Sequence, residues 1–195
     1  MQKWPSILIF GPQGSGKGTQ ATFLRQIAPL VHLSTGDIFR SIPKESELFQ
    51  KLQSFTSKGL LVPDEVTLEI WSSYVEGLIN TFQFNPSKQL LLLDGLPRTI
   101  AQARLLDRWI DVKLVLKLDV QNQDVLVERL SKRARIEGRL DDADETIVRK
   151  RLAIYKETTE QALSHYPSSI IHTIEADAPQ LKVLKDILEI IYPLF

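Results

Sequence analysis

The chain has 195 residues, of which 43% are hydrophobic and 25% charged, with 24 acidic and 24 basic side chains and no cysteine. This composition excludes disordered, collagen-like and coiled-coil chains, and without cysteine the chain can form neither a disulfide framework nor a thiolate zinc site. We therefore expect an intracellular, cytoplasmic protein, and the zero net charge argues against a broadly electropositive nucleic-acid-binding surface.

The sequence offers no sign of a membrane or secretion segment. No uninterrupted apolar run approaches the roughly 20 residues that a membrane helix needs. No apolar stretch precedes the first short strand, so no signal peptide is visible. We accordingly expect no membrane partner and no nucleic-acid partner, and we expect a monomer that acts on small molecules.

Short apolar runs alternate along the chain with longer segments of helical periodicity. The runs are continuously apolar and bounded by turn or polar residues, which is typical of buried strands. The predicted strands are Ile7–Phe10, Val31–Leu33, Gln89–Leu93, Leu114–Leu118 and Ile170–Ile174. The predicted helices are Lys17–Ile27, Glu65–Asn80, Ala101–Trp109, Asn122–Ala134, Glu145–His165 and Gln180–Ile191. Because strands separated by helices need crossover connections, we predict one α/β domain with a five-stranded parallel sheet flanked by helices.

Two segments do not fit this alternation. Ser34–Pro63 contains no good strand, only short helical pieces at Asp37–Ser41 and Glu45–Thr56. Lys132–Asp142 is polar and charged, contains Gly138, and is predicted as a short excursion between two long helices. The pattern by itself does not decide whether these segments are functional lobes or ordinary surface connections.

A glycine-rich loop follows the first strand. Ile7–Phe10 runs directly into Gly11–Thr19, which matches G-x-x-x-x-G-K except that Gly18 stands where Ser or Thr is usual. Glycines let several backbone N–H groups point inward and form an anion cradle, and the helix that starts near Lys17 adds its positive end. Lys17 then supplies a point charge to the β and γ phosphates, and Thr19 becomes the candidate hydroxyl for a Mg²⁺ ion.

The loop therefore predicts a nucleoside triphosphate site. The alternative is a glycine-rich turn between strand and helix that binds no ligand. The predicted triphosphate-binding residues of this loop are Gly14, Ser15, Gly16, Lys17, Gly18 and Thr19.

Three further segments are distinctive: Leu33–Arg40, read as LSTGDIFR; Gly59–Glu65, read as GLLVPDE; and Leu93–Gln102, read as LDGLPRTIAQ. Together with the glycine-rich loop they resemble the adenylate kinases, within the nucleoside monophosphate kinase family. The resemblance covers nearly the whole chain, through Gly138–Asp142 and Arg151–Tyr155. It implies a P-loop NTPase fold with a small helical lobe for the monophosphate and a short lid.

The resemblance also implies boundaries. The core comprises residues 1–33, 63–131 and 143–195, the monophosphate-binding lobe residues 34–62, and the lid residues 132–142, without the longer insertion that sometimes carries zinc. We therefore expect no zinc.

The chain departs from the family pattern at three places. Leu96 stands where Phe is usual and Gln13 where Pro is common, and we expect both to alter packing only. The segment Asp141–Arg151 is one residue longer than usual, so either Arg149 or Arg151 corresponds to the family's arginine; we adopt Arg151.

Phosphoryl transfer brings two anionic nucleotides together, so a site for it needs many fixed cations. Five of the eleven residues from 129 to 139 are basic, opposed only by Glu137. In isolation such a run is a solvated face, and we leave Lys132 and Arg135 as solvated. The resemblance implies catalytic roles for Lys17, Arg98, Arg129, Arg133, Arg139 and Arg151, with Arg129 and Arg133 on the ATP side and Arg40, Arg98, Arg139 and Arg151 on the AMP side.

Three aspartates are candidates for specific roles. Asp94 ends a predicted parallel strand beside the P-loop strand, where ligands bind, so we assign it to Mg²⁺ through water; the alternative is a helix N-cap. Asp141 and Asp142 either pair with lid cations or cap the helix that contains Glu145. The three histidines have no ligand spacing and are interpreted as structural.

The choice of base rests on a few side chains. The resemblance implies that Thr35, Thr99 and Gln102 favour adenine, since the Gln amide both donates and accepts as the edge of adenine does. It implies further AMP contacts from Leu60, Leu61, Val62 and Gly95, and an ATP-base contact from Ala178.

The resemblance implies reversible phosphoryl transfer from Mg-ATP to AMP, giving two ADP. The alternatives are a pyrimidine monophosphate kinase acting on UMP or CMP, a P-loop hydrolase or switch, and a nucleotide sensor without catalytic activity.

Overall fold

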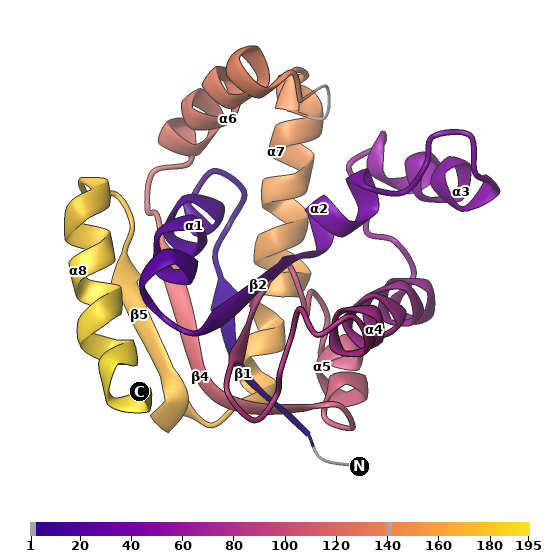
Figure 1. Ribbon diagram of the computed structural model, residues 1–195. Coiled ribbons are helices and arrows are strands. Elements are labelled where there is room, and N and C mark those ends of the chain that lie inside the picture. The colour runs from indigo at the N-terminus through magenta and orange to yellow at the C-terminus, as the bar shows by residue number, and fades with distance from the viewer. Residues whose placement is uncertain (1–2, 140–141) are drawn as a thin grey trace.

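The computed structural model describes residues 3–139 and 142–195, and it contains the predicted parallel sheet (Figure 1). The strand order is β2-β3-β1-β4-β5 and every neighbouring pair is parallel. The strands are β1 (Trp4–Phe10), β2 (Leu30–Ser34), β3 (Leu90–Asp94), β4 (Ile110–Asp119) and β5 (Ile171–Glu175). All five predicted strands and the α/β fold class are confirmed, and only β1 and β4 begin noticeably earlier than predicted.

Helices cover both faces of the sheet because successive side chains of each strand point to opposite faces. On one face Ile7 and Ile9 of β1 lie in a buried cluster with Leu24 and Ile187, from two of the helices. On the other face Leu8 lies in a second cluster that includes Trp71. The helices are α1 (Lys17–Ile27), α2 (Thr35–Arg40), α3 (Glu47–Thr56), α4 (Asp64–Asn80), α5 (Ile100–Leu106), α6 (Gln123–Glu137), α7 (Glu145–Ile154) and α8 (Gln180–Ile191).

Local sequence explains where several helices begin. Side-chain oxygens accept from the backbone N–H groups of the first turn in the manner of N-caps: Ser34 caps α2, Ser46 caps α3, Thr99 caps α5, Asn122 caps α6 and Asp144 caps α7. Thr99 rather than Asp94 therefore caps α5, and Asp144 rather than Asp142 caps α7. No helix within residues 3–139 and 142–195 is long and apolar enough to cross a bilayer.

Three predicted helices end at different residues in the structure. The helix predicted for Ala101–Trp109 ends at Leu106. The helix predicted for Asn122–Ala134 continues to Glu137 and ends at Gly138, whose φ of 65° is a left-handed conformation typical of helix C-caps. The excursion predicted for Lys132–Asp142 is therefore partly wrong, since its first half extends α6. The helix predicted for Glu145–His165 is α-helical only to Ile154, after which the chain makes a π-helical turn and then a 3₁₀ turn.

The connections place the functional loops at one edge of the sheet. The connection from β1 runs to β2 at one edge of the sheet, whereas the connection from β3 runs in the opposite direction, to β4. The direction of the connections therefore reverses between the neighbouring strands β1 and β3. In open parallel sheets, ligands bind at such a reversal, outside the carboxyl ends of the strands. Figure 1 shows the loop between β1 and α1 at this edge, with α6 to one side of it and the α2–α3 segment to the other.

Candidate active site

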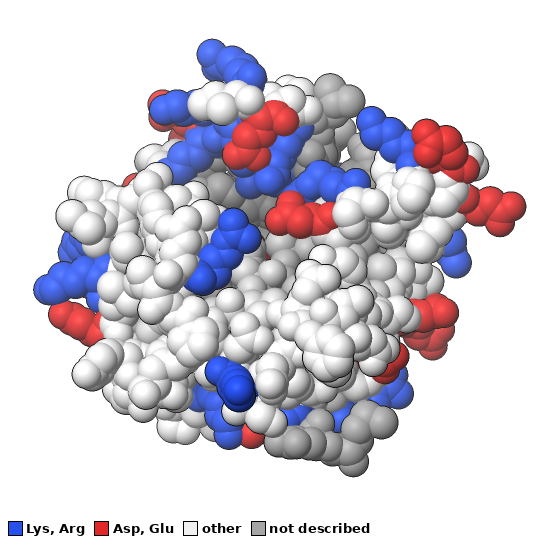
Figure 2. Space-filling view, viewed as in Figure 1, with Lys and Arg blue, Asp and Glu red and all other residues white. Residues whose placement is uncertain are grey.

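A cavity of about 1540 Å³ opens at the carboxyl edge of the sheet. Figure 2 shows basic side chains gathered around the rim of this hollow. Its lining comes from the glycine-rich loop, α2, α3, the ends of β2 and β3, α6 and α7. Except for Thr99, the lining includes each residue that the sequence assigned to a site, namely Gly14, Ser15, Gly16, Lys17, Gly18, Thr19, Thr35, Arg40, Leu60, Leu61, Val62, Asp94, Gly95, Arg98, Gln102, Arg129, Arg133, Arg139, Arg151 and Ala178.

Three other residues lie differently from the expectations. Lys132 lines the cavity although we expected it to be solvated. Thr99 is not among the lining residues; it caps α5 and donates from Oγ1 to Asp64. Gln13 lines the cavity and its Oε1 is buried with no hydrogen-bond partner within the described residues, so its replacement of Pro has a polar consequence besides packing.

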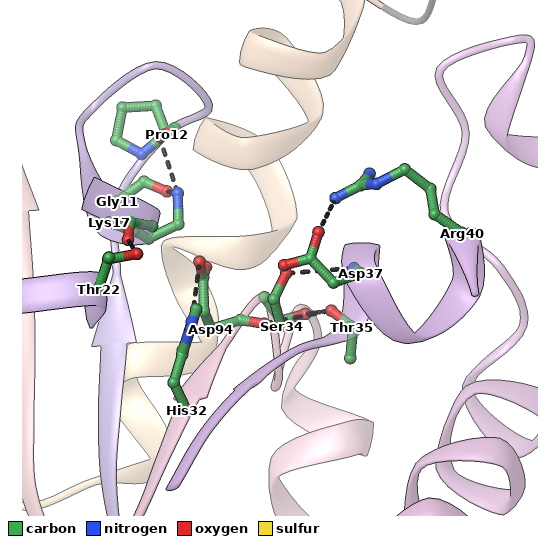
Figure 3. Close-up of polar contacts among 12 residues, drawn as sticks. Gly11, Pro12, Lys17, Thr22, His32, Ser34, Thr35, Asp37, Arg40 and Asp94 are labelled. Carbon is green, nitrogen blue, oxygen red and sulfur yellow. Dashed lines mark hydrogen bonds and ion pairs between the residues drawn. The ribbon is translucent and has the colours of Figure 1, made fainter. Parts of the chain in front are cut away.

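The glycine-rich loop is wrapped around the amine of Lys17. Lys17 Nζ donates to the carbonyl oxygens of Gly11 at 2.8 Å and Pro12 at 3.0 Å, as Figure 3 shows. Gly14 and Gly16 have φ values of 83° and 97°, which glycine adopts at little cost and which let the loop turn back into the helix. The loop thus holds a buried cation beside backbone amides, a combination that suits phosphate.

Burial, together with the positive charges of Arg98, Arg133 and Arg151 and against the opposing charge of Asp94, lowers the pKa of the Lys17 amine to about 8. Burial also disfavours the charged form of Asp94, yet Lys17, His32 and Arg98 together hold the pKa of its carboxyl below the ordinary value. The amine and the carboxylate therefore stabilise each other's charge, although burial disfavours the charged form of both.

Asp94 lies at the end of β3 and pairs with a residue that the sequence analysis treated as merely structural. The Nε2 atom of His32 in β2 is 3.8 Å from Asp94 Oδ2 (Figure 3). Because β2 and β3 are adjacent and parallel, with Ser34 opposite Asp94, only the sheet order brings this histidine to the carboxylate.

The oxygen donors at this edge suit Mg²⁺. Asp94 is a carboxylate with a lowered pKa, Thr19 lines the cavity with its hydroxyl-bearing side chain exposed, and Ser15 Oγ is buried without a partner within the described residues. No three His, Cys, Asp or Glu side chains cluster closely enough in the described parts of the chain to hold a metal between them. A donor set of this size fits Mg²⁺, which usually keeps several waters and takes substrate phosphates as further ligands.

A fully buried carboxylate organises the basic residues of α6 and α7. Asp142 Oδ2 accepts from Arg133, with the Nε at 2.7 Å and the Nη2 at 2.5 Å, and its Oδ1 accepts from Arg151 Nη1 at 2.9 Å. Asp142 therefore pairs with cations, one of the two roles considered for it, while Asp141 lies outside the described residues.

Arg149 and Arg151 take opposite sides of α7. Arg151 lines the cavity, whereas Arg149 is half exposed and pairs with Glu145 at 2.8 Å and Asp124 at 3.3 Å. Hydrogen bonds to these two carboxylates raise the pKa of Arg149. This placement supports Arg151, rather than Arg149, as the arginine of the site.

Four other arginines of the cavity also have carboxylate or carbonyl partners. Arg40 pairs with Asp37 at 2.5 Å, Arg139 with Glu137 at 2.6 Å, and Arg129 with Asp177 at 3.5 Å. Arg98 Nε donates to the carbonyl of Gly95 at 2.8 Å, and burial, followed by the charge of Arg151, lowers the pKa of its guanidinium. The cations are thus held in place before any ligand arrives.

The opposite end of the cavity is built around Gly95. Thr35 Oγ1 donates to the carbonyl of Gly95 at 3.0 Å. A Cβ on Gly95 would lie 2.5 Å from Thr35 Oγ1, so only glycine fits there. Gln102 is 99% buried by side-chain and backbone contacts, and its amide Oε1 accepts from the backbone N–H of Arg98 at 2.7 Å.

We predict that ATP binding weakens as the pH rises through about 8, because Lys17 loses its proton near that value in the free protein whereas bound phosphates favour the charged amine. The apparent Kd should rise by about tenfold or more between pH 7.5 and 9.5. Calorimetric titration at constant ionic strength measures it. A Lys17→Arg variant stays charged and should give a flat profile, and a flat wild-type profile would contradict the role of burial.

We predict that Asp142→Ala lowers the free energy of unfolding by about 3 to 5 kcal/mol, because it removes the carboxylate between two largely buried guanidinium groups. Urea unfolding measures the change. Asp144→Ala is the matched control: it removes a helix cap two residues away and should cost about 1 kcal/mol. Equal losses in the two variants would count against the organising role of Asp142.

Comparison with known proteins agrees with this geometry. The adenylate kinase family model matches residues 9–171. A protein of Flavobacterium psychrophilum named adenylate kinase is 38% identical over 193 residues, covering 95% of this chain and 97% of its own. Proteins of the same name from Thermobifida fusca and Corynebacterium aurimucosum are 39% and 41% identical, covering 89% and 84% of this chain and 90% and 87% of their own. The chain belongs to the adenylate kinase family.

Proposed function

We propose that the protein catalyses reversible transfer of the γ-phosphoryl group of Mg-ATP to AMP, giving two ADP. The observation that carries this proposal is that the residues assigned to the donor and to the acceptor nucleotide line one continuous cavity, together with the partly buried cations Lys17 and Arg98. Family membership supports the same reaction.

The glycine-rich loop receives the triphosphate. Its backbone N–H groups and the N-terminus of α1 face the β and γ phosphates, and Lys17 exchanges its two loop carbonyls for phosphate oxygens. Arg129 and Ala178 lie at the ATP end of the cavity, toward the adenine. Thr19, together with Asp94 through water, would hold Mg²⁺, which when bound neutralises phosphate charge and orients the leaving group.

The acceptor nucleotide lies toward α2 and α5. Arg40 and Arg98 hold its phosphate, since a guanidinium fork matches phosphate oxygens in pairs. Thr35, Gln102 and Gly95 surround the base with Leu60, Leu61 and Val62. In the transfer, an oxygen of the AMP phosphate attacks the γ-phosphorus in line, the bond from that phosphorus to the β–γ bridging oxygen breaks, and the bridging oxygen remains with the departing ADP.

Arg133, Arg139 and Arg151 stabilise the charge that spreads over the transferring group; their lining of the same cavity as Lys17 and Arg98 supports this role. Residues 34–62 serve as the monophosphate-binding lobe and residues 132–142 as the lid, and their closure excludes the water that would otherwise hydrolyse ATP. We place the protein in the cytoplasm as a monomer that binds ATP, AMP and ADP.

A panel of acceptors tests the proposed reaction. With Mg²⁺ and ATP, ADP formation should be fastest with AMP and slower by orders of magnitude with UMP or CMP, and it should stop when Mg²⁺ is chelated. Faster turnover of UMP or CMP would indicate a pyrimidine monophosphate kinase. ATP loss without any acceptor would indicate a hydrolase, and binding of both nucleotides without turnover would indicate a sensor.

We predict that Arg98→Ala lowers kcat/KM for AMP by the equivalent of about 2 to 5 kcal/mol, because it leaves the buried phosphate charge without its partner. Steady-state kinetics at saturating ATP measures the change. Arg104→Ala on the exposed side of α5 is the matched control and should leave kcat/KM unchanged. A loss below about tenfold in Arg98→Ala, equivalent to 1.4 kcal/mol, would argue against the role of Arg98.

A further inference from the structure

Asp64 links the end of the proposed monophosphate-binding lobe to the start of α5. It is the first residue of α4, and its carboxylate accepts two hydrogen bonds from α5 and its cap. Gln102 Nε2 donates to Asp64 Oδ1 at 2.7 Å, and Thr99 Oγ1 donates to Asp64 Oδ2 at 2.9 Å.

The two partners of the Gln102 amide have fixed polarity. A carboxylate such as that of Asp64 can only accept hydrogen bonds, so it holds the amide nitrogen. The backbone N–H of Arg98 can only donate, and it holds the amide oxygen at 2.7 Å. Gln102 is buried, so turning its amide over would leave two buried groups facing partners of the wrong kind. The orientation of the amide is therefore determined by this network.

These two hydrogen bonds engage only half of the hydrogen-bonding groups of the Gln102 amide. A primary amide has two N–H donors and two acceptor lone pairs, so one N–H and one lone pair of Gln102 remain. Gln102 lines the cavity, and these remaining groups form a donor beside an acceptor. A 6-aminopurine offers the complementary pair, an amino donor next to a ring-nitrogen acceptor, whereas a 6-oxopurine offers an acceptor next to a donor.

We propose that Asp64 is a positioning residue that fixes the Gln102 amide and thereby makes the acceptor site select a 6-aminopurine monophosphate over a 6-oxopurine monophosphate. This inference rests on the proposed function, because it concerns the acceptor side of the same reaction. Asp64 acts through Gln102 and does not itself line the cavity.

A purely structural role is the competing explanation. Asp64 lies in the first turn of α4, where a negative charge also interacts favourably with the helix dipole. Glu65 is its neighbour in the same turn, is exposed, and has no hydrogen bond or ion pair described to Gln102 or Thr99, so Glu65→Gln removes the same charge without touching the amide. The pair Asp64→Ala, which removes both acceptor oxygens, and Glu65→Gln therefore separates positioning from helix electrostatics.

The experiment measures kcat and KM for AMP and for inosine monophosphate at saturating Mg-ATP, together with KM for ATP and Tm, in wild type and each variant. In Asp64→Ala, which removes both acceptor oxygens, the ratio of kcat/KM for AMP to that for inosine monophosphate should fall by about tenfold or more, the change expected from losing one buried hydrogen bond. The fall should come mainly from a higher KM for AMP, with KM for ATP unchanged within about twofold. Glu65→Gln should keep the wild-type ratio, and Asp64→Glu, which retains a carboxylate, should recover most of it.

The inference is overturned if Asp64→Ala keeps the wild-type ratio, whatever its Tm, or if Glu65→Gln lowers the ratio equally. Asp64→Ser, whose single hydroxyl can satisfy only one of the two donors, replaces Asp64→Ala if that variant does not fold. Failure of the proposed function is separately visible, since wild type would then form no ADP from AMP, and the inference would fall with it. Normal wild-type turnover with unchanged selectivity in the variants rejects the inference alone.

Discussion

The site depends on several positive charges gathered in one cavity and on the carboxylates whose negative charge offsets their mutual repulsion. Lys17, Arg98, Arg133 and Arg151 are close enough that the arginines depress the pKa of the lysine. The positive charges of Arg151 and Arg40 in turn help to lower the pKa of the Arg98 guanidinium. Such a cluster would be strongly destabilising in a dry interior unless it were paired. Its charge is what two repelling nucleotides require, so the stability of the empty site and the function of the occupied site draw on the same groups.

Two kinds of carboxylate balance this charge. Asp142 is fully buried, and Asp94 lies 3.8 Å from His32 Nε2 with its charged form favoured by Lys17, so both act as permanent parts of the site. Glu137 and Asp37 are substantially exposed, and they hold Arg139 and Arg40. Exposed ion pairs contribute little to stability, typically less than about 1 kcal/mol. A phosphate can therefore take over the outer arginines at small cost, while the inner arginines keep their geometry.

The sheet explains why these groups meet. Lys17 follows β1, Asp94 ends β3, and His32 lies in β2, and these three strands are adjacent and parallel. Their carboxyl ends share one edge, so residues far apart in the chain lie together there. Helices α6 and α7 then bring Arg133 and Arg151 to that edge through their common partner Asp142. Asp64 ties the return from the α2–α3 segment to α5 in the same way, through Gln102 and Thr99.

The amino-acid sequence by itself determined the α/β class, the five strands and the phosphate loop, because these depend on short-range patterns: apolar runs, helical periodicity, and glycines at fixed spacing before Lys17. It did not determine where α6 ends, since the cap at Gly138 lies beyond the apolar pattern, nor that Lys132 faces the cavity. Only the tertiary structure showed that Arg151 faces the cavity and Arg149 does not. Residues two positions apart on an α-helix point in directions about 200° apart, and the packing of α7 decides which of them faces inward. The tertiary structure alone also brought Asp64 to Gln102 and His32 to Asp94, since a hydrogen bond or ion pair between distant segments depends on how the elements pack and leaves no trace in local sequence.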